Sequence, residues 1–168
     1  MTAWKNIIVH HSASDWGTAR VIDGWHKQRG WSGIGYHFVI LNGFTNYEDR
    51  KRDRCMHSLI GSIETGRPIN LDPFISQSEV GAHALGFNKN SIGICLIHRD
   101  GAYHANMYTS LIELLDELVH KFGIDPVNIK GHYEVDAKKP HCPGIDMRII
   151  RDIIGHVEKR KEDCRATK

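Results

Sequence analysis

The chain has few cysteines, no long apolar run and little excess of either charge. Its 168 residues include four cysteines that show no short paired spacing: Cys55, Cys95, Cys142 and Cys164. In a reducing compartment we therefore expect free thiols, with room for one metal ligand among them. The formal net charge is +2, and no basic stripe is interleaved with aromatic residues, so nucleic-acid binding is not indicated.

Membrane insertion is not indicated either, because no apolar stretch approaches the roughly 20 residues that span a bilayer. The first residues run directly into the strand-like Ile7–Val9, without the basic start and long apolar core of a signal peptide. We expect synthesis in the cytoplasm, so that an extracellular substrate would be reached only with the help of another component.

Strand and helix patterns are interspersed along the chain, which predicts an α/β fold with a central mixed sheet flanked by helices. The 168 residues, 40% of them hydrophobic, are enough for one domain with one substantial core. We place this domain at residues 1–160 and a polar, frayed tail at 161–168. Strands are predicted at 6–10, 36–41, 92–97 and in a short segment ending at Ile129, and helices at about 19–29, 109–122 and 146–159.

The middle of the chain contains turn signals and a long irregular segment. Asn42-Gly43 is a strong hairpin signal, so residues 44–47 are expected to return antiparallel to the preceding strand. The mixed charges of residues 48–54 predict a solvated loop or an exposed helical turn. Residues 55–78 have poor periodicity and several breakers, which is typical of a surface excursion that borders a substrate groove.

Histidine and cysteine are combined in the stretch Lys130–Gly144, which places His132 and Cys142 ten residues apart. Neutral imidazole and thiolate are both good zinc ligands. His10, at the end of the first predicted strand, is a third candidate, and three protein ligands would leave a fourth position for water. The spacing alone is a weak signal, because His10 is more than a hundred residues away. At this point His10 and His11 remain explicable as ordinary loop histidines.

A set of short segments makes the combination more specific. They are Ile8-Val9-His10-His11-Ser12-Ala13-Ser14, Gly35-Tyr36-His37-Phe38, Gly81-Ala82-His83-Ala84, Asn90-Ser91-Ile92-Gly93, and Gly131-His132-Tyr133-Glu134-Val135 through Cys142-Pro143. In this order they resemble the zinc-dependent N-acetylmuramoyl-L-alanine amidases, the type 2 amidase and peptidoglycan-recognition protein family. The stretch Trp25–Trp31 is similar to the bacteriophage T7 lysozyme-like branch, and the likeness covers about residues 5–155.

The resemblance implies one zinc ion per chain, with His10, His132 and Cys142 as its ligands. It also implies that a tyrosine beside the metal assists the attacking water or stabilises the oxyanion, and that two histidines line the substrate groove: Tyr36, His37 and His83. The implied reaction is hydrolysis of the amide between N-acetylmuramic acid and the L-alanine of the stem peptide.

The sequence departs from the family pattern at two places. The cytosolic recycling branch carries a glutamate where this chain has Cys95, so the resemblance implies no carboxylate base there. The family also has a lysine or threonine two residues before the last ligand, where this chain has Pro140. Counting forward from His132 assigns the catalytic lysine to Lys138. Counting back from Cys142 gives position 140, and Lys139 lies one residue before that position. His141 remains an alternative to Cys142 as a ligand.

The predicted protein is a monomeric peptidoglycan amidase, a phage or prophage endolysin that reaches the cell wall after holin-type release. Three alternatives remain: a non-catalytic peptidoglycan-binding module, an interbacterial effector amidase, and a structural zinc domain. A binding module would lack the cysteine ligand, whereas this chain keeps both Cys142 and Tyr36. A structural zinc domain would supply four protein ligands and leave no open position.

Overall fold

A five-stranded mixed sheet forms the centre of the computed structural model, which describes residues 3–70, 72 and 74–166. The strands are β1 (Asn6–His11), β2 (Phe38–Ile40), β3 (Ile63–Thr65), β4 (Ser91–Leu96) and β5 (Ile129–Gly131). Their order is β3-β2-β4-β1-β5. Neighbours from β2 to β5 run parallel, and β3 pairs antiparallel with β2. The predicted α/β fold with a central mixed sheet is therefore confirmed.

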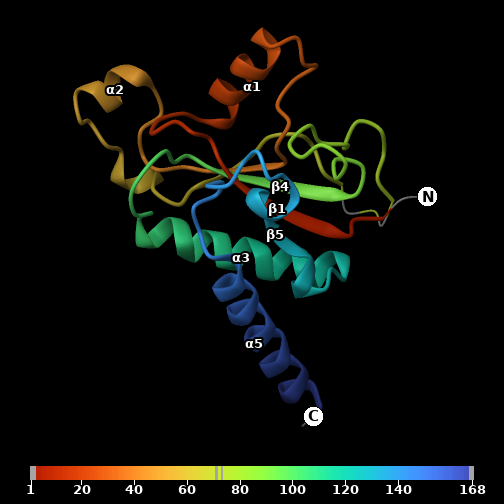
Figure 1. The fold of residues 1–168 in the computed structure, drawn as a ribbon. Helices are drawn as coiled ribbons and strands as arrows, with labels where there is room; N and C mark the ends of the chain where they lie inside the picture. The colour runs from red at the N-terminus through yellow and green to blue at the C-terminus, as the bar shows by residue number, and fades with distance from the viewer. Residues whose placement is uncertain (1–2, 71, 73, 167–168) are drawn as a thin grey trace.

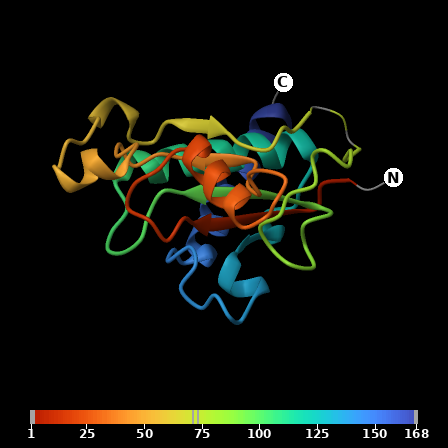
Figure 2. The same ribbon diagram turned by 90° about the horizontal axis from the view of Figure 1, so that it is seen from above.

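Helices cover the sheet on both faces, as Figures 1 and 2 show. They are α1 (Ala19–Gln28), α2 (Tyr47–Lys51), α3 (Ala105–Phe122), α4 (His132–Val135) and α5 (Met147–Ala166), with single 3₁₀ turns at His57–Leu59 and Pro126–Asn128. Helices α3 and α5 lie below the sheet in Figure 1, and α1 lies above it. No helix in the part of the chain that the structure describes combines the length and apolarity needed to cross a bilayer.

The alternation of side chains along the central strands decides which face carries chemistry. Ile92, Ile94 and Leu96 of β4 belong to the core cluster between the sheet and helices α3 and α5. Cys95 belongs to the smaller cluster on the α1 side. Because His10 lies opposite Cys95 in the parallel register, the histidine projects to the α1 side of the sheet.

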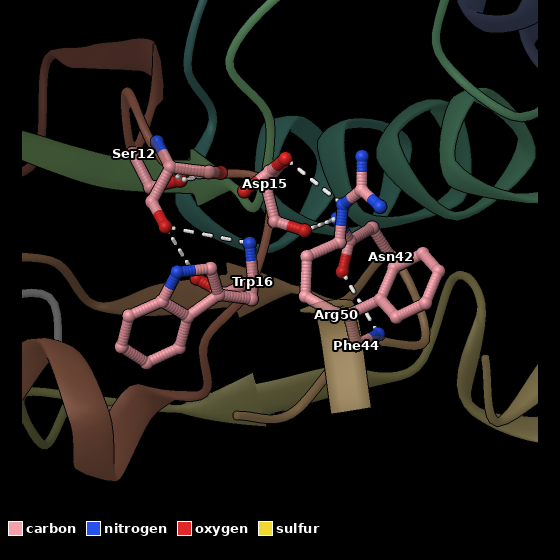
Figure 3. A network of polar contacts seen from close by, with 7 residues as sticks. Ser12, Asp15, Trp16, Asn42, Phe44 and Arg50 are labelled. Carbon is pink, nitrogen blue, oxygen red and sulfur yellow. Dashed lines mark hydrogen bonds and ion pairs between the residues drawn. The ribbon is translucent and has the colours of Figure 1, made fainter. Parts of the chain in front are cut away.

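The predicted hairpin at Asn42-Gly43 is wrong, because β2 pairs instead with β3 from the excursion. The Asn42 side chain accepts a hydrogen bond from Phe44 N at 3.0 Å and donates one to the Asp15 carbonyl at 2.8 Å (Figure 3). A Cβ on Gly43 would lie 2.7 Å from Cys55 Sγ. These contacts turn the chain away from β2 and pack it against the excursion, so residues 44–47 form no return strand.

Two helices are longer than predicted. Helix α3 begins at Ala105, capped by the His104 side chain, and histidine is not among the usual capping residues. Helix α5 continues past Lys159 to Ala166, through most of the segment expected to be a frayed tail. Lys161 Nζ lies 2.7 Å from Asp116 of α3, which ties this part of α5 to the body. Residues 167–168 of the predicted tail lie outside the described residues.

Candidate metal centre

Two parallel strands bring the first two candidate ligands together. Val9 of β1 lies opposite Gly131 of β5, so the residues that follow them, His10 and His132, are neighbours although 122 positions separate them. Their ring centroids are 4.4 Å apart, and their Nδ1 atoms are 3.1 Å apart. Both rings are removed from solvent, with exposures of 0% for His10 and 8% for His132.

The turn from β5 into α4, which carries His132, is fixed by its neighbours. Gly131 N donates a hydrogen bond to Glu134 at 2.8 Å, and both carboxylate oxygens of Glu134 accept from Arg151 of α5 at 3.0 Å. A Cβ on Gly131 would lie 2.6 Å from the Tyr133 ring, so this passage requires glycine. The Glu134 carboxylate is thus engaged in holding the turn.

Cys142 reaches the two histidines from a loop that is tied back on both sides. Its backbone N donates to the Lys139 carbonyl at 3.1 Å, and its carbonyl accepts from Tyr133 N at 2.9 Å. The backbone N of His11 donates to Cys142 Sγ at 3.4 Å, which joins the loop to β1. Cys142 is 7% exposed, whereas His141 is exposed and lines a separate cavity of about 490 Å³.

The three donor atoms fit a shared metal ion. They lie within 4.8 Å of one another. Tetrahedral zinc with bonds of roughly 2.05 Å to nitrogen sets its nitrogen ligands about 3.3 Å apart, close to the observed 3.1 Å between the Nδ1 atoms of His10 and His132. Two imidazoles and one thiolate suit zinc, and three protein ligands leave a position for water.

Burial sets the protonation of the candidate ligands in the metal-free chain. It lowers the pKa of His10 well below its ordinary value, helped by the neighbouring His83 and His132 rings, and it also lowers the pKa of His132. Both imidazoles are therefore neutral at pH 7, as metal ligation requires. Burial raises the pKa of the Cys142 thiol to about 11, so this thiol keeps its proton until a metal displaces it.

Tyr36 stands beside the cluster, with its ring centroid 5.1 Å from that of His10. Burial raises the pKa of its hydroxyl well above the ordinary value, and the neighbouring Cys95 and Cys142 thiols raise it further. The hydroxyl therefore keeps its proton at neutral pH. In the metal-free chain Tyr36 is a hydrogen-bond donor rather than a base.

A cavity of about 290 Å³ opens beside the cluster and is lined by His132, His83 and Lys139 among others. Lys138, which the sequence favoured, is not among the described residues that line this cavity. The segment between His132 and Lys139 is not an extended loop. It contains α4 and a tight turn in which Lys139 N donates to the Asp136 carbonyl at 2.9 Å.

The structure does not support substrate contact by His37. Its side chain is completely buried. Its Nδ1 accepts from Gly93 N and its Nε2 donates to the Glu79 carbonyl, both at 2.8 Å. Both ring nitrogens are used, so His37 joins β4 to the end of the excursion. His83 lines the cavity, but its ring nitrogens contact His10 and Ser91.

Asp136 and Trp31 also line the cavity, and sequence reasoning nominated neither of them. Asp136 Oδ2 lies 3.9 Å from His132 Nε2, the ring nitrogen that faces away from the cluster. The spacing of four residues would have suggested this pair had a helical turn been predicted at 132–135. Trp31 is 40% exposed, and its position in a turn gave no signal of its own.

The loop that follows β1 is anchored by a polar network (Figure 3). Ser12 Oγ donates to the Ser14 carbonyl at 2.9 Å. Arg50 of α2 donates to the Asp15 carboxylate at 2.9 Å. The charge run was predicted to form a solvated loop or an exposed helical turn; it contains the exposed helix α2, and its Arg50 also contacts this loop, next to the strand that carries His10.

Comparisons with known proteins agree with this geometry. Residues 1–145 match the family model described as N-acetylmuramoyl-L-alanine amidase. The endolysin of Escherichia phage T7 is 35% identical over 152 residues, which cover 84% of this chain and 82% of that protein. The endolysin of Klebsiella phage KP32 is 31% identical over 153 residues, covering 86% and 83% respectively.

Solved structures show the same fold. N-acetylmuramoyl-L-alanine amidase LysC from Clostridium intestinale superposes with a TM-score of 0.68 at 30% identity, covering 92% of this chain and 87% of that one. A variant of Drosophila PGRP-LB in complex with tracheal cytotoxin superposes with a TM-score of 0.60 at 26% identity, covering 85% and 76%.

Proposed function

The chain belongs to the N-acetylmuramoyl-L-alanine amidase family, and from this membership we propose that it is a zinc-dependent peptidoglycan amidase of the phage endolysin kind. It hydrolyses the amide bond between N-acetylmuramic acid and the L-alanine of the stem peptide. The observation that carries the proposal is the buried cluster of His10, His132 and Cys142 beside an open cavity.

The ligand set of the proposed enzyme is His10 Nδ1, His132 Nδ1 and Cys142 Sγ. Zinc bound there supplies a Lewis acid and lowers the pKa of a bound water towards about 7. The chain contributes two neutral imidazoles and one thiol that becomes a thiolate. It also holds all three donors in place before the substrate arrives, because β1, the turn after β5 and the Cys142 loop are joined by hydrogen bonds.

Tyr36 and Lys139 act on the substrate side of the site. The raised pKa of Tyr36 favours a hydroxyl that donates a hydrogen bond to the carbonyl oxygen as negative charge develops on it. The cationic Lys139 at the cavity wall favours the same charge. His132 and Asp136 form the adjoining wall of the cavity.

The relatives named endolysins support a cellular role in the release of phage. In this role the protein is a monomer that is made in the cytoplasm and reaches the wall after holin-type permeabilisation of the membrane. A non-catalytic binding module is the second candidate function. It is disfavoured because the chain retains both the cysteine ligand and the tyrosine that a purely binding protein does not need.

One experiment separates these functions. Purified sacculi are treated with the zinc-loaded parent chain, the chelated chain and the His10→Ala variant, and zinc content and released muropeptides are measured. We expect the parent to contain one zinc ion and to release stem peptides with a free L-alanine amine, and both other samples to release none. The matched control is His11→Ala, which removes the adjacent imidazole and should retain zinc.

Two results would contradict the proposal. Full release by a chelated, zinc-free chain would exclude the metal, and zinc binding by the parent without any cleavage would leave only a binding module. Tyr36→Phe tests the oxyanion role, since it should retain zinc and lose about 100-fold or more in turnover.

A further inference from the structure

His10 has a second side-chain contact, on the side of its ring that faces away from the cluster. Its Nε2 lies 3.0 Å from Nδ1 of His83, and the two rings meet edge to face at 88° with centroids 5.0 Å apart. Both side chains are buried, at 0% and 8% exposure. Because the Nδ1 atom of His10 faces His132, both nitrogens of the His10 ring are committed.

The far side of the His83 ring determines where its hydrogen sits. Its Nε2 lies 3.3 Å from both the carbonyl oxygen and the hydroxyl of Ser91. The Ser91 hydroxyl donates its only hydrogen to the Phe87 carbonyl at 2.8 Å, so it can only accept from His83. Both partners of His83 Nε2 are thus acceptors, and that nitrogen must carry the hydrogen.

The position of the hydrogen on His83 determines the position of the hydrogen on His10. A neutral His83 ring with its hydrogen on Nε2 has a lone pair on Nδ1. That lone pair accepts the hydrogen of His10 Nε2, which leaves the Nδ1 lone pair of His10 directed at the cluster. The carbonyl and hydroxyl oxygens of Ser91 therefore select, through two imidazoles, the tautomer of His10 that can bind a metal.

The position of the His83 ring is also fixed by packing. A Cβ on Gly93 of β4 would lie 2.7 Å from His83 ring atoms, so the ring rests directly on the strand backbone. The backbone N of His83 donates to Asn88 Oδ1 at 2.8 Å. The ring cannot move towards β4, and its loop is tied to Asn88.

We propose that His83 is a positioning residue for the zinc ligand His10: it accepts the Nε2 hydrogen of His10 and so fixes both the tautomer and the orientation of that ligand. This inference rests on the proposed function and assigns His83 a role other than substrate contact. Partners of metal-bound histidines commonly contribute 10–100-fold to metal affinity. A role limited to packing or to the substrate groove would not affect metal affinity through an acceptor atom.

The test uses two substitutions of His83 in the full chain. His83→Leu fills the space and removes the acceptor, whereas His83→Asn places an amide oxygen near the position of Nδ1. Zinc affinity is measured by competition with a chromogenic chelator. We expect about a 10–100-fold loss for His83→Leu and recovery of most of that loss in His83→Asn. The control is His26→Leu, which removes another buried histidine whose Nδ1 accepts from Gly35 N instead.

A second measurement needs no variant. Long-range ¹⁵N–¹H correlation spectra of the zinc-loaded parent should show the ring hydrogens of His10 and His83 on Nε2. A hydrogen on Nδ1 of either ring would overturn the inference, as would a folded His83→Leu variant with the zinc affinity of the parent. Equal losses in the Leu and Asn variants would also overturn it. A parent that binds no zinc would instead refute the proposed function, and the inference with it.

Discussion

At the scale of single residues, Lys139 and Lys138 provide the sharpest contrast, because they are adjacent and chemically identical. Both residues are exposed, but Lys139 lines the cavity beside His132, whereas Lys138 does not and its backbone N donates to the Asp136 carboxylate at 2.9 Å. We predict that Lys139→Ala lowers turnover about 100-fold through lost stabilisation of developing charge. Lys138→Ala should change turnover little.

The measurement is muropeptide release at saturating substrate, with zinc content determined for each variant. Equal zinc in both variants would show that the lysine acts on the substrate rather than on the metal. The opposite order of activities would return the role to Lys138.

The same pair of residues shows which part of the candidate site could not be predicted from the sequence. The residue types and chain order of His10, Tyr36, His132 and Cys142 were sufficient to nominate a site. They were not sufficient to choose between Lys138 and Lys139, because the helical turn and the tight turn before Lys139 decide which of the two side chains lies at the cavity. Residue counting also could not show that both nitrogens of His37 bind backbone groups, because those groups come from distant segments.

At the scale of elements, the contact between α4 and α5 holds the turn that carries His132. Arg151 of α5 donates to both oxygens of Glu134 and to the Ile129 carbonyl, and the two charged side chains are only 21% and 25% exposed. Replacing Arg151 with Met would leave a half-buried carboxylate and a carbonyl without their donor. We predict a loss of about 1.5–3 kcal/mol in the free energy of unfolding.

Urea unfolding of the metal-free chain measures this loss. The control is Arg148→Met, one turn earlier on the same helix, where the ion pair with Asp146 is exposed and its removal should barely shift the midpoint. Equal shifts of the urea midpoint for the two variants would show that the contact between α4 and α5 stabilises the fold no more than the exposed ion pair does.

Elements with strong local patterns were predicted well. Helix α1 has its expected cap, in which Thr18 accepts from Val21 N at 3.2 Å, and β4 is the buried central strand. The elements that were missed, β3 and α4, are three and four residues long. Segments of this length have too few residues for a periodic pattern, and their conformation is set by pairing with β2 and by the pairing of Glu134 with Arg151.

At the scale of the whole molecule, metal binding should stabilise the fold in a pH-dependent way. The Cys142 thiol, with its pKa raised to about 11, is protonated in the metal-free folded chain at pH 6–7, and it is protonated in the unfolded chain as well. Its raised pKa therefore gives no pH dependence to the metal-free fold in this range. Binding requires the thiolate, so one proton leaves with each metal ion bound.

We predict that zinc at 100 times its dissociation constant stabilises the chain by about 2.7 kcal/mol. The affinity of the chain for zinc should rise about tenfold from pH 6 to pH 7. The reason is that each zinc ion bound releases one proton, which corresponds to about 1.4 kcal/mol of binding free energy per pH unit. Thermal unfolding in zinc buffers measures both quantities. Cys142→Ala should lose this pH dependence, and a parent whose affinity did not change with pH would contradict the assignment of Cys142.

The separation of the ligands along the chain has a consequence for the order in which the protein is made. His10 is translated before the other two candidate ligands, and 122 positions separate it from His132. Because β1 is also bordered by β4 and β5, the first ligand is placed only when these later strands have joined it. A nascent chain that stops before Cys142 carries an incomplete three-ligand set, so the proposed metal centre cannot assemble until that residue has been translated.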